Sequence, residues 1–153
     1  MSRATAPVVG VALLLAVTVT ASIAVGTVAL ALDAPSTAPP ASLSLTADAD
    51  EDSLRFRHRG GRTLDTESLR LVVTVSDERL AHQPPIPFFA AKGFHSGPTG
   101  PFNTGASSRW AAGERAGFRI ATTNAPLLDD GDRVTVAVFR REMRIVTLRT
   151  TAR

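Results

Sequence analysis

The hydrophobic side chains of this chain follow one pattern before residue 33 and a different one after residue 42. From Pro7 to Leu32 there is no charged side chain, and 19 of these 26 residues are Ala, Val, Ile or Leu. At about 1.5 Å per residue, a helix of this length crosses the roughly 30 Å of hydrocarbon in a bilayer. Only a helix satisfies its own backbone hydrogen bonds in lipid. The run therefore predicts a hydrophobic transmembrane α-helix over residues 4–32.

After residue 42 the pattern changes to short runs in which apolar and polar side chains alternate, as in half-buried strands. Residues 33–42 before them hold three prolines and no large side chain, which predicts a semi-rigid linker. Turns are expected at the acidic segment 48–52, at Gly60-Gly61 and at 140–142. The expected strand runs are 43–45, 54–56, 69–75, 118–120, 134–138 and 145–148.

These runs predict the fold class. No amphipathic helical window separates them, and many short strands with turn signals favour a sandwich of antiparallel sheets. The expectation is an α+β chain in overall form. One long N-terminal hydrophobic α-helix would be followed by a mainly antiparallel, Ig-like β-sandwich over residues 43–153.

A long insert, residues 84–114, interrupts the alternation. It holds five of the ten prolines and five of the eight aromatic residues. A segment of about 30 residues without regular structure is usually a folded Ω-loop or a functional loop. Its aromatic side chains would either cap the sandwich or form a contact patch for other subunits or for a surface. They are Phe88, Phe89, Phe94, Phe102 and Trp110.

The apolar N-terminal run has three interpretations. It could be a cleaved secretory signal, since Ala29-Leu30-Ala31 offers a small-residue cleavage site, although the run is about twice as long as such signals need. It could also be a plain membrane anchor. The third interpretation is a helix that packs against copies of itself.

Small residues at helical spacing favour the third interpretation. They let helix backbones approach closely, and a lone anchor has no use for them. The predicted packing positions are Ala12 and Ala16 on one face, and Thr18, Ser22 and Gly26 on the neighbouring face.

Composition excludes several kinds of chemistry. The chain has no cysteine, so disulfides, zinc–thiolate sites and cysteine nucleophiles are impossible. The net charge is only +3, with 17 Lys and Arg against 14 Asp and Glu. The arginines are dispersed along the alternating strands, which indicates a solvated face and no nucleic-acid partner.

The remaining candidate residues do not form a catalytic or metal-binding pattern. His58, His82 and His95 lack metal-ligand spacing and are expected to be unrelated surface or turn residues. Asp129-Asp130-Gly131-Asp132 lacks the alternating ligands of a calcium loop and predicts a turn. No nucleophile elbow or phosphate-binding loop is present. We expect no enzyme activity, no cofactor and no metal.

The N-terminal sequence resembles a known family. Residues 2–11 read Ser-Arg-Ala-Thr-Ala-Pro-Val-Val-Gly-Val and lead into a long Val/Ala/Ile/Thr run. This is similar to archaeal type IV pilins, especially haloarchaeal ones. Later segments resemble recurrent pieces of their outer domains; these are His58-Arg59-Gly60-Gly61-Arg62, Trp110-Ala111-Ala112-Gly113-Glu114 and residues 131–136.

The resemblance implies a class III signal leader at residues 1–3. A prepilin peptidase would cut between Arg3 and Ala4 and leave the hydrophobic helix on the mature protein. Membrane lipid would hold the precursor, with its N-terminus cytoplasmic and its head outside. An assembly ATPase and a platform protein would then build copies of the chain, or the chain with other pilins, into a cell-surface pilus used in adhesion. The alternative is a single-span surface protein whose β-sandwich binds a partner without polymerising.

Overall fold

The computed structural model describes residues 8–19 and 41–153. The chain divides into two compact units, Met1–Ala38 and Pro39–Arg153. The described part of the first unit is a helix of 12 residues, 8–19, here called the N-terminal helix. The second unit, here called the head, is built from β-strands. Strands make up 46% of the structure.

The predicted fold class, a long N-terminal helix followed by an Ig-like sandwich, is wrong. The described residues contain one short helix and no long apolar one. The predicted length depended on a hydrocarbon environment, where the backbone must bond internally. Propensity alone does not favour a long helix here, because Val17, Thr18 and Val19 are β-branched and stiff at χ1. The other residues of the predicted helix, 4–7 and 20–32, lie outside the described residues, as do residues 33–40 of the predicted linker.

No helix within residues 8–19 and 41–153 combines the length and the apolar character needed to cross a bilayer.

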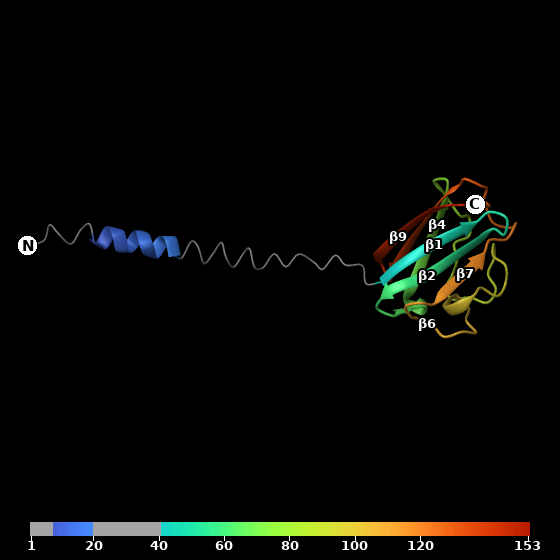
Figure 1. Cartoon of the computed structure of the whole chain (residues 1–153), viewed down its shortest axis with the longest axis horizontal. Helices are drawn as coiled ribbons and strands as arrows, with labels where there is room; N and C mark the ends of the chain where they lie inside the picture. The colour runs from blue at the N-terminus through green and yellow to red at the C-terminus, as the bar shows by residue number, and fades with distance from the viewer. Residues whose placement is uncertain (1–7, 20–40) are drawn as a thin grey trace, which may run out of the picture. The chain divides into compact units, whose positions relative to one another are not determined.

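The head contains two main sheets and one small sheet, and all strand pairs are antiparallel. The first sheet has the order β1-β2-β7 (Figure 1), the second has the order β5-β4-β8-β9, and the small sheet pairs β3 with β6. Two 3₁₀ turns, η1 (Thr66–Ser68) and η2 (Gly100–Phe102), accompany them. The strands are β1 (Ala41–Asp48), β2 (Ser53–Gly61), β3 (Leu64–Asp65), β4 (Leu69–Val75), β5 (Glu78–Arg79), β6 (Arg109–Trp110), β7 (Arg115–Arg119), β8 (Arg133–Arg140) and β9 (Met143–Thr151).

The observed strands cover the runs of alternating residues, apart from one position. The run at 118–120 extends one residue past β7, to Ile120. The turns expected at 48–52 and 140–142 join β1 to β2 and β8 to β9. The turn expected at Gly60-Gly61 is wrong, because both glycines lie in β2 and pair with Ser42 and Ala41. A register shift between Ser42 and Leu43 bends the ladder there instead.

The two main sheets share one hydrophobic core. Alternate side chains of each strand point inward, so period-two hydrophobicity produces one buried and one solvated face. The fully buried side chains of the second sheet are short and β-branched or aliphatic, while the first sheet contributes Leu54 and Phe56. Those of the second sheet are Leu71, Val73, Val75, Val134, Val136 and Val138.

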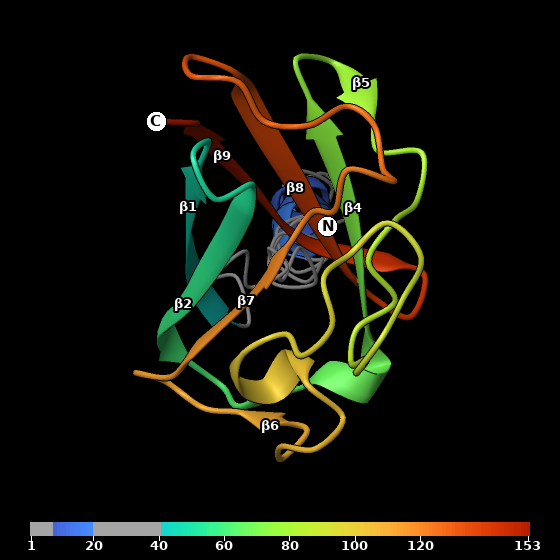
Figure 2. The ribbon, with the colours of Figure 1, turned by 90° about the vertical axis from the view of Figure 1, so that its right-hand side faces the viewer.

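The long insert lies across the side of the head between β4 and β7 (Figure 2). At the β4 side, the Gln83 side chain accepts a hydrogen bond from Val73 N–H at 2.7 Å and donates to Val73 O at 3.0 Å. At the β7 side, Thr99 N–H donates to Gly117 O at 2.8 Å. Gln83, the residue before the insert, therefore extends the hydrogen bonding of the second sheet at the edge of β4 beyond the short β5, and the insert does so at the edge of β7.

The side chain of Asn124 links its own loop to the segments around His82 and Gly93 through hydrogen bonds. Its side chain is 5% exposed and uses its full hydrogen-bonding capacity. The amide donates to His82 O at 2.9 Å and to Gly93 O at 3.2 Å. Its oxygen accepts from His82 N–H at 2.9 Å and from Ala125 N–H at 3.0 Å.

Replacing Asn124 by alanine should destabilise the head by about 2–4 kcal/mol, because several buried backbone groups lose their partners. Trp110 is the only tryptophan and is fully buried, so its fluorescence in a denaturant titration reports the loss. The exposed neighbour Thr123→Ala is the control and should change stability by less than about 0.5 kcal/mol. Equal midpoints for Asn124→Ala and the parent chain would contradict the assigned role.

Candidate assembly segment and surface groove

The N-terminal helix exposes its apolar side chains on every side. Every residue from 8 to 19 is exposed, and all except Gly10 and Thr18 are Ala, Val or Leu. Val8 is 68% exposed and Leu14 is 69% exposed. An exposed apolar surface of this kind marks a contact with lipid or with protein.

The small residue Ala12 creates a depression on this helix. The depression is lined by Ala12 together with Val8, Val11 and Leu15. Ala16 lies one turn further along the same face. A side chain of a second helix could enter such a depression, because a small residue allows close approach of the backbones.

Thr18, on the other predicted packing face, turns its hydroxyl back onto its own helix. Its Oγ1 donates to Leu14 O and to Leu15 O, at 2.9 Å each. This leaves the methyl group as the outward part of the side chain. The other packing positions, Ser22 and Gly26, and the cleavage residues Arg3 and Ala4 lie outside the described residues.

The aromatic residues of the insert divide into a buried group and one exposed side chain. Phe89 is 62% exposed. The other four are at most 6% exposed and belong to the core, so they offer no surface to a partner; they are Phe88, Phe94, Phe102 and Trp110.

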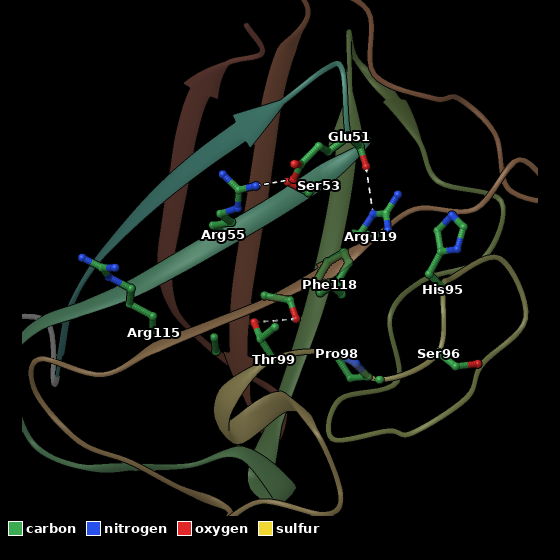
Figure 3. A pocket seen from close by; sticks show the side chains of 13 residues that line it. Glu51, Ser53, Arg55, His95, Ser96, Pro98, Thr99, Arg115, Phe118 and Arg119 are labelled. Atoms are coloured by element: carbon green, nitrogen blue, oxygen red, sulfur yellow. Dashed lines mark hydrogen bonds and ion pairs between the residues drawn. The ribbon is translucent and has the colours of Figure 1, made fainter.

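A surface groove of about 510 Å³ lies where the insert meets the outer face of the first sheet (Figure 3). One wall is the insert from His95 to Thr99, and the floor is β7 around Gly117. Glycine is required at this floor position: a Cβ on residue 117 would lie 2.7 Å from Leu54 O of β2. The close approach of β2, β7 and the insert therefore requires a residue without a Cβ at position 117.

Three arginines border the groove. Arg55 of β2 pairs with Glu51, and its guanidinium is 3.6 Å from Asp48. Arg119 donates from Nε to Glu51 O at 3.3 Å. Arg115 forms no ion pair with the described residues. The groove can thus hold an anionic group, but it presents no nucleophile paired with a base for catalysis.

The sequence interpretation missed this clustering of arginines. The sequence alone indicates dispersed arginines, whereas β2 carries Arg55, Arg57 and Arg59 at every second position. The register then places Arg57 directly opposite Arg115 of β7. Arginine at every second position of β2 was the available signal that these side chains share one face. The pairing of β2 with β7 joins segments about 60 residues apart, so the sequence pattern could not predict that Arg115 lies opposite Arg57.

The histidines do not assemble into a metal site, and the expectation for His58 was wrong. His58 is fully buried in β2, where its ring packs edge-on against Trp110 at 5.8 Å. Its Nε2 lies 3.0 Å from Arg62 O, while Nδ1 has no hydrogen-bond partner among the described residues. Within residues 8–19 and 41–153, no group of three His, Asp or Glu side chains could hold a metal ion.

The acidic segment 129–132 forms a bonded turn. Asp132 accepts from the Ser76 hydroxyl at 2.7 Å and from Asp129 N–H at 2.9 Å. These two bonds, Ser76 first, lower the pKa of Asp132 below its ordinary value of 3.8, against a small opposing effect of burial.

No protein-family model matches this chain, and no curated protein is similar to it in sequence.

Asp132 should contribute stability that depends on pH. Because its pKa is lower in the folded chain than in the unfolded one, the contribution is complete well above pH 3.8 and disappears as the pH falls through the folded-state pKa. Asp132→Asn should therefore lower the unfolding midpoint at pH 7, and its difference from the parent should shrink towards pH 3. Asp130→Asn, at an exposed carboxylate that forms no ion pair with the described residues, is the matched control. A difference that does not change between pH 7 and pH 3 would contradict this role.

Proposed function

We propose that the chain is a type IV pilin-like structural subunit whose N-terminal segment mediates assembly into an extracellular fibre. The observation that carries this is the contrast between the two units. The N-terminal helix leaves its apolar side chains exposed, whereas the head buries its own in a single core. A helix with that surface needs a permanent apolar environment, supplied first by lipid and then by other subunits.

The energetic argument follows from exposed area. Burying one Val or Leu side chain contributes about 1.5–3 kcal/mol. The helix exposes Val8, Leu13 and Leu14 by more than 60% each, so lateral contact with copies of itself has a large apolar surface to bury. Transfer of the helix from lipid to a bundle of helices adds little hydrophobic free energy, because both environments are apolar. Close packing at Ala12 supplies the preference for the bundle over lipid.

The sequence supports an orientation and a processing step. Arg3 is the only charge before the apolar run, which favours a cytoplasmic N-terminus and an exported head. Cleavage between Arg3 and Ala4 by a prepilin peptidase would remove residues 1–3. The assembly ATPase and the platform protein follow from the resemblance to archaeal pilins. The role is structural rather than catalytic, at the cell surface and in the fibre.

The groove favours a second candidate, a surface protein that is anchored by residues 7–32 and binds a partner without polymerising. Its volume of about 510 Å³ lies in the range of ligand sites. Phe89 of the insert is exposed and accepts a backbone hydrogen bond from Gly97 of the groove wall at 2.7 Å, and it would add an apolar contact to such a partner.

The mature N-terminus distinguishes these functions. Mass spectrometry of the chain isolated from cells that contain a prepilin peptidase should find Ala4 as the first residue. An intact N-terminus including Arg3 would support the anchored binding protein. A start near Asp33 would indicate a secreted head and would contradict both.

Substitution at the depression tests the packing role of the N-terminal helix. Ala12→Leu fills it and should reduce fibre yield about tenfold, the effect of ~1.4 kcal/mol per contact. Membrane insertion should not change, because leucine is more apolar than alanine. Val17→Phe is the control, since it adds bulk about 140° around the helix from Ala12 and about 100° from Thr18. Parental fibre yield from Ala12→Leu would remove this face from the assembly contact.

A further inference from the structure

The head carries opposite charges at its two ends. The base is the end where β1, β4, β7 and β9 begin and where β2 and β8 end; the tip is the opposite end. The chain enters the head at the base, through Ala41. Strand register and the turns that join the strands place the charged residues named below at one end or the other, although charges of both signs occur along the sequence.

The base is positive. Nine exposed arginines lie there against four acidic residues, so its net charge is +5. None of the nine forms an ion pair with a carboxylate of the described residues; one of them, Arg70, instead stacks on Phe139 at 4.3 Å. The arginines are Arg57, Arg59, Arg62, Arg70, Arg109, Arg115, Arg140, Arg141 and Arg144, and the acidic residues are Asp65, Glu67, Glu114 and Glu142.

The tip is acidic. It holds nine of the chain's 14 acidic residues. Six arginines lie in the same half, and two of them, Arg55 and Arg133, are already paired with acids there. The acidic residues are Asp48, Asp50, Glu51, Asp52, Asp77, Glu78, Asp129, Asp130 and Asp132.

Hydrogen bonds connect the acidic segments of the tip to one another. Asp52 accepts from Leu128 N–H at 2.9 Å, which links the β1–β2 turn to the loop before β8. Ser76 links the β4–β5 turn to Asp132 at 2.7 Å. The C-terminus joins the β1–β2 turn, because Ala49 N–H donates to Arg153 O at 2.9 Å. The acidic surface is therefore fixed by the fold.

We infer that the base of one head binds the tip of the next copy of the chain, in a repeating head-to-tail contact. This rests on the proposed fibre function. If the N-terminal segments run parallel in a fibre, every head points the same way, and neighbours along the fibre present unlike ends. A contact between unlike surfaces does not close on itself and generates a filament. The unpaired arginines of the base and the acids of the tip are complementary in such a contact.

Charge reversal tests this contact. The base-reversed chain carries Arg59→Glu, Arg62→Glu and Arg140→Glu. The tip-reversed chain carries Asp50→Arg, Glu78→Arg and Asp130→Arg, three acids whose side chains form no ion pair with the described residues. Each variant alone places like charges in contact and should give about tenfold fewer fibres than the parent in electron micrographs of cells.

Two combinations should restore assembly. A chain with all six substitutions has an acidic base and a basic tip, and it should form fibres at near-parental yield with an unchanged net charge. Co-expression of the two singly reversed chains should also restore fibres, in which the two chains alternate. Lys92→Glu, a reversal at a residue that belongs to neither substituted set, is a charge control, and Trp110 fluorescence confirms that each head is folded.

The outcomes separate this contact from the proposed function. Parental fibres from both singly reversed chains, or no fibres from a folded chain with all six substitutions, would overturn the contact and leave the pilin-like function standing. Loss of fibres from the base-reversed chain alone would also overturn it, and would assign the base to another anionic surface such as lipid headgroups. A parent chain that forms no fibres would overturn the function and the contact together.

Discussion

The head depends on a continuous series of aromatic contacts that joins the long insert to the first sheet. Phe88 and Phe94 of the insert meet at 5.6 Å, and Phe94 meets Phe118 of β7 at 5.3 Å. The series continues through Phe56 of β2, at 5.9 Å from Phe118, and ends at Phe102 and Trp110. Offset and edge-on pairs of this kind add about 0.5–1.5 kcal/mol each beyond area burial. The insert is therefore part of the core.

The position of the insert determines the surface features around it. Because its aromatic rings lie under the first sheet, its backbone must run close to β7, and glycine is needed at 117 and at 100. A Cβ on residue 100 would lie 2.1 Å from Arg115 O, and Gly100 has φ +61°. The same approach forms the wall of the arginine-bordered groove. Core packing and surface chemistry are thus connected through two glycines.

Period-two hydrophobicity predicted the strands well because each main strand has one buried and one solvated face, as in β2 and β8. It could not predict which strands pair, and so it missed the facing of Arg57 with Arg115 and the charge difference between the ends. The two-residue strands β3, β5 and β6 were also missed, because two residues carry no period. The helix prediction failed for another reason. The predicted helix length assumed that the apolar run lies in lipid. The pattern of apolar residues does not by itself establish that environment.

The way the insert covers β7 bears on how such heads behave when many are crowded together. An open strand edge recruits strands from neighbouring molecules and leads to edge-to-edge aggregation. Here the outer edge of β7 is already occupied, since Thr99 pairs with Gly117 and His95 N–H donates to Arg119 O at 3.0 Å. The first sheet can therefore be concentrated on a surface without strand exchange at that edge. At the edge of β7, neighbouring heads can therefore contact one another only through side chains, and such contacts are reversible.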